Sequence, residues 1–311
     1  MNRKQALTVY LRGIAMGAAD VVPGVSGGTV AFVTGIYEEL INSIRSVNAQ
    51  ALKLLFKEGI PAAWRHINGN FLLALMLGIL TSVLSLARLI SLWLEQYPLL
   101  VWSFFFGLIL ASSWHMARQL KRWNIGLVVA ILVGVAAAYA VGELKPSELS
   151  PQPLIIFASG AVAICAMILP GISGSFILVL LGMYPHVLGA VRDLNLLFLG
   201  TFAAGCGCGL LGFAHILAWL FRRFHDLTMA LLTGFLLGSL NLVWPWKHTL
   251  SWYHNSHGKL MALTQENVLP ATYGSLTGEN SLMWWCLLLM VLGVFIVLLL
   301  EKVGKSQSSK G

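Results

Sequence analysis

Two short stretches of the sequence repeat the pattern Pro-Gly-x-Ser-Gly, one beginning at Pro23 and the other at Pro170. Glycine and proline at this density interrupt a helix, so each pattern is expected to precede a new helix with unpaired backbone N–H groups. These N–H groups, a serine hydroxyl and the positive end of the helix dipole together favour an anion, above all a phosphate. Glycine lets the anion approach the backbone closely because it has no side chain. The repeated pattern therefore predicts an anion-binding site.

The residues that would contact the anion lie within and directly after the two patterns. These candidates are Ser26, Gly27, Gly28, Thr29, Ser173, Gly174 and Ser175. Two further candidates, Arg45 and Arg192, lie at the far ends of the helices that the patterns begin. A guanidinium group has the geometry to bind a phosphate, so these arginines could capture one at either membrane face. The alternative is that both arginines only extend to the membrane interface as anchors.

The rest of the chain indicates that the two patterns lie in a membrane protein. Of the 311 residues, 58% are hydrophobic and only 10% are charged, whereas about 25% are charged in a typical soluble domain. Apolar segments that approach the roughly 20 residues of a spanning helix fall at about 6–22, 25–46, 70–95, 98–117, 124–143, 153–169, 171–191, 194–221, 227–246 and 281–300. We therefore expect an all-α polytopic membrane protein.

The distribution of charge predicts the orientation of these segments. The net charge of +8 does not indicate a nucleic-acid-binding protein, because the basic residues are scattered over short loops between apolar segments. With both termini in the cytoplasm, fourteen Lys and Arg residues lie in the inner loops. The outer loops then hold only Lys145, Arg192, Lys247 and Lys259. This bias follows the positive-inside rule, so we expect a multi-pass protein with both termini cytoplasmic.

Matching residues in the two halves indicate an internal repeat. A shift of 147 residues superposes Pro23 on Pro170, and it aligns Gly35, Tyr37 and Arg45 with Gly182, Tyr184 and Arg192. A shift of 127 residues aligns Gly78 with Gly205 and Gly107 with Gly234. Because each half has five apolar segments, the two halves would enter the membrane from opposite sides. We expect two inverted-topology repeats, residues 1–146 and 147–311, within one membrane domain.

The Pro-Gly-x-Ser-Gly pattern is expected to form a broken or re-entrant helical hairpin at the start of each repeat. Lipid does not tolerate broken backbone unless protein buries it or it lines a wet cavity. Two broken elements in corresponding positions of inverted halves are typical of a binding site near the membrane midplane in secondary transporters. The alternative is that the glycines only allow close helix packing.

Carboxylates accompany the first pattern but not the second. Asp20, Glu38 and Glu39 correspond to Met167, Pro185 and His186 in the second half. Ionisable groups at membrane depth are candidates for function. The three acids are therefore candidates for binding a coupling ion, a proton or sodium, that is carried with the anion. Alternatively, Asp20 caps a helix or pairs with Arg12.

Spacing also suggests how these side chains are displayed. Thr34, Glu38, Asn42 and Arg45 are spaced so that they would form one stripe along a continuous helix. Residues 48–66 are amphipathic and are expected to lie along the cytoplasmic interface.

Other polar and sulfur-containing residues are predicted to have no catalytic or metal-binding role. Residues 247–280 are expected to be the longest outer loop, with His254 and His257 a solvated pair rather than a metal site. The cysteines Cys165, Cys206, Cys208 and Cys286 are expected to be buried small hydrophobic residues. No metal and no cofactor is expected.

The run Met16-Gly17-x-x-Asp20-x-x-Pro23-Gly24-Val25-Ser26-Gly27-Gly28-Thr29, followed by Gly35-Ile36-Tyr37-Glu38, resembles the signature of a bacterial membrane family. This family, formerly a domain of unknown function, is that of the polyprenyl-phosphate transporters. The resemblance extends over nearly the whole chain, because Pro170–Ser175 also fits. It implies a flippase that returns undecaprenyl phosphate, the carrier lipid of peptidoglycan and cell-wall synthesis, to the inner leaflet of the bacterial cytoplasmic membrane. The implied partners are this lipid and the membrane lipids, and the sequence leaves open whether the chain forms a homo-oligomer.

Two other functions are left open by the residues. The pattern also resembles the Pro-Gly-x-Ser-Arg-Ser turn of integral-membrane undecaprenyl-pyrophosphate phosphatases, but Gly27 and Gly174 occupy the position of its arginine. Phosphoryl transfer needs cationic stabilisation, so we expect a transporter by alternating access and not an enzyme. The adjacent Glu38 and Glu39 keep a phosphatase as an alternative. Paired helix N-termini would also suit a small-anion transporter or channel.

Overall fold

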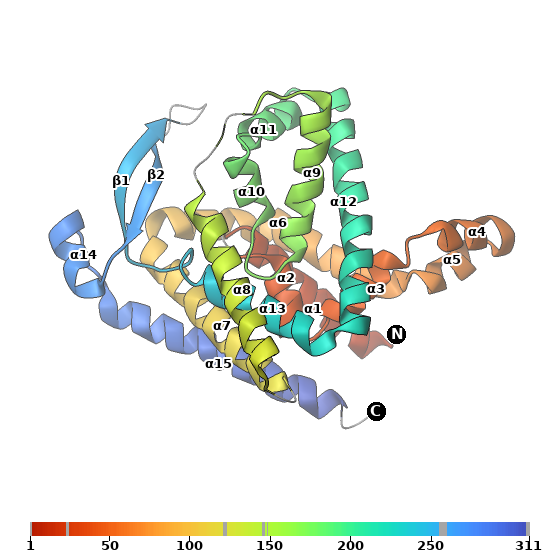
Figure 1. Ribbon diagram of the computed structural model, residues 1–311, viewed down its shortest axis with the longest axis horizontal. Helices are drawn as coiled ribbons and strands as arrows, with labels where there is room; N and C mark the ends of the chain where they lie inside the picture. The colour runs from red at the N-terminus through yellow and green to blue at the C-terminus, as the bar shows by residue number, and fades with distance from the viewer. Residues whose placement is uncertain are drawn as a thin grey trace.

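A computed structural model of the protein describes residues 2–22, 25–120, 123–144, 147, 149–254 and 260–308. Several residues discussed above lie outside the described residues: Pro23, Gly24, Lys145, Lys259, His257 and the side chain of His254. Within the described part, the chain forms fifteen helices and one two-stranded antiparallel sheet (Figure 1).

The elements follow the predicted segments closely. The first half contains α1 (Arg3–Asp20), α2 (Gly27–Val33), α3 (Tyr37–Arg45), α4 (Ala49–Glu58), α5 (Ile60–His66), α6 (Gly69–Gln96), α7 (Pro98–Gln119) and α8 (Ile125–Glu143). The second half contains α9 (Pro153–Ile168), α10 (Gly174–Leu180), α11 (Tyr184–Arg192), α12 (Leu196–Arg223), α13 (His225–Ser239), β1 (Lys247–His254), β2 (Leu260–Asn267), α14 (Pro270–Thr277) and α15 (Met283–Ser308). The segments predicted over 25–46 and 171–191 are each divided into two short helices.

Helices α6, α7, α8 and α12 are each long and apolar enough to cross a membrane. Together, α10 and α11 are apolar enough for a further crossing, but the chain bends by 107° between them. Such a bend belongs to a broken span or a re-entrant loop. Helix α9 and the apolar part of α15 are shorter apolar helices. The chain is therefore a mostly helical, multi-pass membrane protein, as its composition predicts.

The long helices pack in four pairs: α1 with α6, α9 with α12, α7 with α15 and α8 with α13. Glycines allow the close approach within these pairs. A Cβ added to Gly134 in α8 would lie 2.9 Å from the Cα of Gly234 in α13, closer than van der Waals contact. A Cβ on Gly107 in α7 would collide with the carbonyl oxygen of Met290 in α15. Small residues at helix contacts are the usual means of packing helices in lipid.

The short helix α2 lies in the middle of the molecule, where it packs on α1, α7 and α9 (Figure 1). Helix α3 packs mainly against α12. The main hydrophobic core surrounds these elements, and Val25, Ala31, Ile36 and Tyr37 are almost completely buried in it. The broken segment of the first half is thus enclosed by protein.

The two ends of the molecule differ in character. Helices α4 and α5 project from the side on which both termini lie, while the hairpin β1–β2 and α14 lie on the opposite side (Figure 1). Leu52, Phe56 and Ile60 are exposed on the projecting helices, beside the basic Lys53 and Lys57. This arrangement supports the predicted amphipathic character of residues 48–66.

Residues 247–280, predicted to be an outer loop between membrane segments, connect α13 to α15 and form β1, β2 and α14. Two tryptophans before the hairpin hold this region in place. The Trp244 indole donates to the carbonyl oxygen of Val268 at 2.9 Å, and the Trp246 indole donates to that of Ser281 at 2.9 Å. The many polar residues of the two strands conceal them from a search for apolar segments.

Candidate functional site

The two helix breaks lie against each other, although they are far apart in the sequence. The hydroxyl of Ser26 donates to the carbonyl oxygen of Leu169 at 3.0 Å, across a separation of 143 residues. The N–H of Gly171 donates to Thr29 Oγ1 at 3.0 Å. Ser26, Thr29 and Gly171 are all buried. Each break therefore provides hydrogen-bond partners for polar groups of the other break. Backbone groups at membrane depth need such partners, because lipid offers none.

The first break leads into α2, whose N-terminus is already capped. Ser26 Oγ accepts from the N–H of Thr29 at 3.2 Å, as an N-cap serine does. Asp20, the last residue of α1, accepts from the N–H of Gly27 at 2.6 Å. A carboxylate thus occupies the end of the helix that favours an anion. The prediction of free N–H groups after the first pattern is wrong at Gly27 and Thr29, and Asp20 caps the helix.

The second break leaves the start of α10 more open. Ser173 Oγ accepts from the N–H of Phe176 at 3.5 Å and lies 2.8 Å from Ser175 Oγ. Met167 stands where the first half has Asp20, so this helix lacks the matching carboxylate cap. The N–H groups of Gly174 and Ser175 precede the first intrahelical bond, and no described residue accepts from them. Of the two copies, the second thus begins its helix with two consecutive backbone N–H groups that no described residue accepts from.

The first-pattern glycines face protein, not open space. A Cβ on Gly28 would collide with the carbonyl oxygen of Ile168 and lie 3.0 Å from that of Met167. A Cβ on Gly27 would lie 2.7 Å from Asp20 Oδ2. Gly28 lets α2 begin directly against the end of α9, and Gly27 lets it begin against the Asp20 carboxylate at the end of α1, so close packing accounts for both glycines.

Left-handed glycines end the two short helices. Gly35 has a φ of 73° and Gly182 a φ of 66°, a conformation that favours glycine. Because α2 ends before Gly35, the prediction that Thr34 shares one continuous helix with Glu38, Asn42 and Arg45 is wrong for Thr34, whereas the other three residues all lie on α3. Instead, the Thr34 hydroxyl donates to the carbonyl oxygen of Val30 at 2.7 Å, within its own helix.

The two arginine candidates lie where the sequence places them, at the ends of α3 and α11. Arg192 is exposed and forms an ion pair with Asp193 at 3.0 Å. Arg45 is partly buried. The two residues occupy corresponding positions at the ends of bent pairs, α2–α3 and α10–α11, but they lie apart from the contact between the two breaks.

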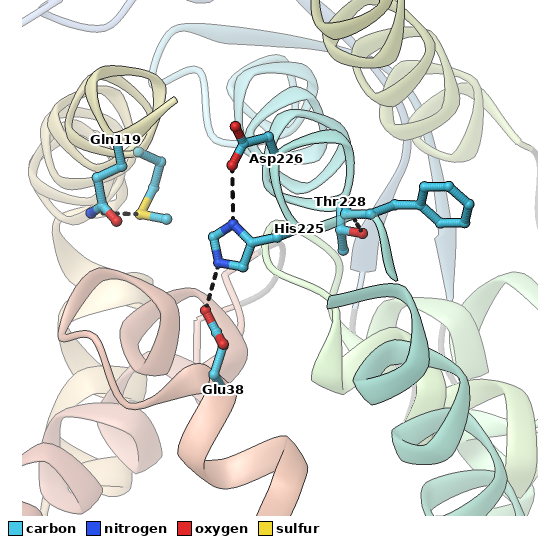
Figure 2. Close-up of polar contacts among 7 residues, drawn as sticks. Glu38, Gln119, His225, Asp226 and Thr228 are labelled. Carbon is cyan, nitrogen blue, oxygen red and sulfur yellow. Dashed lines mark hydrogen bonds and ion pairs between the residues drawn. The ribbon is translucent and has the colours of Figure 1, made fainter. Parts of the chain in front are cut away.

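Glu38 and Glu39 are adjacent but bind different partners. Glu39 Oε1 accepts from the side-chain amide of Asn68 at 2.9 Å. Glu38 Oε1 lies 3.1 Å from His225 Nε2, and His225 Nδ1 lies 3.1 Å from Asp226 Oδ1. Figure 2 shows the imidazole between the two carboxylates, which come from α3 and from the start of α13. This cluster joins the two halves of the chain.

His225 begins α13 and is separated from the end of the span α12, at Arg223, only by Phe224. Burial opposes its protonation, but the hydrogen bonds to Asp226 and Glu38 outweigh burial and raise the pKa of His225 above its ordinary 6.5. When protonated, the imidazole donates to both carboxylates. Sequence reasoning missed His225, because its partner Glu38 lies 187 residues away and no local motif marks the pair.

Lys247 is a second charged residue whose environment the sequence did not indicate. Its Nζ donates to the carbonyl oxygen of Leu242 at 2.6 Å and lies 5.6 Å from the centre of the Trp102 ring. Burial lowers the pKa of Lys247 to about 8. The residue attaches the start of β1 to α7, on the side of the molecule opposite the termini (Figure 1).

The described residues contain no group of three His, Cys, Asp or Glu side chains that could hold a metal ion. Cys286 is buried, and Cys165 and Cys206 are partly buried. The prediction that all four cysteines are buried is wrong for Cys208, which is exposed. Residues two positions apart on a helix point in different directions, so Cys206 packs toward α9 while Cys208 faces outward.

Comparisons with known proteins cover nearly the whole chain. A family model described as VCA0040-like, undecaprenyl phosphate translocase-like, matches residues 16–261. A polyprenyl-phosphate transporter of Vibrio cholerae serotype O1 is 52% identical over 299 residues, which cover 96% of this chain and 97% of that protein. A polyprenyl-phosphate transporter of Staphylococcus aureus is 31% identical, over 87% of this chain and 96% of that protein. No solved structure matches the chain significantly.

Proposed function

Since the chain belongs to the undecaprenyl phosphate translocase-like family, we propose that it moves a polyprenyl phosphate between the leaflets of the bacterial cytoplasmic membrane. The structural observation that carries this proposal is the buried contact between the two helix breaks, from Ser26 to Leu169 and from Gly171 to Thr29. Two interrupted helices that meet inside a membrane protein are typical of a transporter's substrate site.

In this proposal the phosphate head group binds at the start of α10. Ser173, Gly174 and Ser175 provide two backbone N–H groups without described acceptors and two hydroxyl groups. The positive end of the short helix adds to the attraction. The candidates from the first pattern, Ser26, Gly27, Gly28 and Thr29, form the facing wall and hold the second break in position.

We further propose that the two halves, 1–146 and 147–311, are inverted repeats that move against each other in alternating access. The packing of the long helices supports this. Helix α1 packs on α6 as α9 packs on α12, and α7 packs on α15 as α13 packs on α8. The aligned glycines Gly107 and Gly234 lie at the last two of these contacts. The last long helix of each half, α8 in the first and α15 in the second, thus packs against a helix of the other half.

Orientation and head-group capture follow from the same proposal. Both termini lie on one side of the molecule (Figure 1), and the positive-inside bias makes this side cytoplasmic. Arg45 would then capture a phosphate at the inner face and Arg192 at the outer face. The acids Asp20, Glu38 and Glu39 remain the candidates for binding a coupling proton or sodium ion. Of these, Glu38 has a titratable partner in His225.

The test is transbilayer movement of a fluorescently labelled polyprenyl phosphate in liposomes that contain the purified protein. A membrane-impermeant reductant removes the label from the outer leaflet. With the protein present, the label of the inner leaflet should also become accessible. The double variant Arg45→Ala/Arg192→Ala should slow this movement, and Ser26→Ala or Ser173→Ala should weaken the central site.

Two parallel measurements separate the rival functions. Release of inorganic phosphate from a polyprenyl pyrophosphate would identify a phosphatase. Uptake of labelled inorganic phosphate, without movement of the lipid, would identify a small-anion carrier. If the labelled lipid does not move under any imposed proton or sodium gradient, the transport proposal is refuted.

A further inference from the structure

A cavity of about 60 Å³ lies between α3 and α12, away from the contact between the two breaks. Its lining has two parts. Ile41, Ala218 and Phe221 form an apolar wall, and Glu38, Asn42 and Arg222 provide polar and charged groups. This volume holds several water molecules or one compact oxyanion. An apolar wall beside a cation and an amide is suited to the head of an amphiphilic anion.

The charged groups around the cavity are only partly paired. The guanidinium of Arg222 is exposed, and no described residue forms an ion pair or hydrogen bond with it. Glu38 lies on the opposite wall and is held by His225, at 3.1 Å between Oε1 and Nε2. His225 in turn contacts Asp226, as Figure 2 shows. Arg222, which lines the cavity, is therefore available to an anion, and His225 lies behind the lining, where it contacts the Glu38 carboxylate.

We propose that this cavity binds the phosphomonoester head of a lipid, with Arg222 and His225 as its cationic ligands and Asn42 as a hydrogen-bond donor. Ile41, Ala218 and Phe221 contact the first carbons of the chain. A phosphate and a carboxylate compete for the same cations, so the bound head group displaces Glu38 from His225. In the empty protein, Glu38 occupies the place of the ligand.

The position of the cavity gives this site a role. Helix α3 and the C-terminal end of α12 lie on the side of the molecule that carries the N-terminus (Figure 1). This inference rests on the proposed function, under which that side is the inner face. The site then receives the head group from the central breaks and releases it to the inner leaflet. Displacement of Glu38 breaks a hydrogen bond between α3 and α13, which belong to different halves.

The experiment measures binding of farnesyl phosphate to the purified protein in detergent by titration calorimetry, with inorganic phosphate in a parallel titration. We expect Arg222→Gln to raise the Kd for farnesyl phosphate about tenfold, because a charge-assisted hydrogen bond to phosphate is lost. The matched control is Arg223→Gln. Arg223 is the next residue, stacks 6.0 Å from the ring centre of Phe224 and does not line the cavity.

Glu38→Gln separates a binding role from a structural one. This variant removes the competing negative charge, so at a pH below the ordinary pKa of histidine, where His225 stays protonated without Glu38, we expect its Kd for farnesyl phosphate to fall several-fold relative to the wild type. A damaged fold would weaken binding and could not produce this gain. Equal effects of Arg222→Gln and Arg223→Gln, or an unchanged or raised Kd in Glu38→Gln, would overturn the assignment.

Two further comparisons keep the outcomes distinct. If inorganic phosphate binds as well as farnesyl phosphate, the ligand is free phosphate and the proposed lipid contacts are wrong. If the wild type binds farnesyl phosphate through Arg222 but moves no lipid in liposomes, the site stands and the transport function fails. If lipid moves but Arg222→Gln binds like Arg223→Gln, the transport function stands and the site fails.

Discussion

Replacing Thr29 by valine tests the contact between the two helix breaks. Valine keeps the shape of threonine but removes Oγ1, which accepts from the buried N–H of Gly171 at 3.0 Å and lies 3.2 Å from Ser26 Oγ. The N–H of Gly171 would then be buried without a partner. Leaving such a group unpaired costs about 1–3 kcal/mol. We therefore expect Thr29→Val to lower the free energy of unfolding by about 2 kcal/mol.

The matched control is Thr34→Val, at the other end of the same short helix. The Thr34 hydroxyl donates to the carbonyl oxygen of Val30, which also accepts the N–H of Thr34 at 2.9 Å. Its removal leaves no buried group unpaired, so the change should stay within about 0.5 kcal/mol. The assay is denaturant unfolding of both variants in mixed micelles. Equal losses of stability in the two variants would refute the argument that Thr29 joins the breaks.

Two further substitutions test neighbouring features. Gly28→Ala should lower the free energy of unfolding by about 1–3 kcal/mol, because its Cβ would collide with the carbonyl oxygen of Ile168. The control Gly207→Ala should leave the free energy of unfolding unchanged, because nothing lies within 4 Å of the added Cβ. Equal losses of stability in the two variants would contradict the packing at Gly28. The raised pKa of His225 means that its protonated form stabilises the fold below its ordinary pKa of 6.5 and that this stability is lost as pH rises through the raised value. In thermal unfolding from about pH 6 to about pH 9, the wild type should lose up to about 1 kcal/mol of folding stability relative to His225→Gln. Parallel pH profiles of stability for the two proteins would show that protonated His225 does not stabilise the fold.

Local signals predicted much of this structure. Glycine and proline mark the breaks near Pro23 and Pro170, and hydropathy marks the long helices, because both depend on residues next to one another in the chain. The capping of α2 by Asp20 is harder to predict, since the sequence allows this carboxylate to cap a helix, to pair with Arg12 or to bind a coupling ion. Its hydrogen bond to Gly27 depends on how the chain turns between them.

Features that depend on distant residues were missed. His225 and Glu38 are each ordinary polar residues in the sequence, and only the packing of α3 beside the start of α13 brings them together. The exposure of Cys208 depends on which face of α12 packs on α9. Polar strands such as β1 have no apolar run that would separate them from a loop.

The central claim is that a polyprenyl phosphate crosses the membrane past the second break, and one comparison tests it most directly. Transport of the labelled lipid would be measured in liposomes that contain equal amounts of folded Ser173→Ala or Ser103→Ala. Ser103 is also a buried serine, but its hydroxyl donates to Leu99 within its own helix at 2.7 Å. We predict that Ser173→Ala is slower than Ser103→Ala by about tenfold, since it loses a hydroxyl at the head-group site. Equal rates in the two variants would contradict the account.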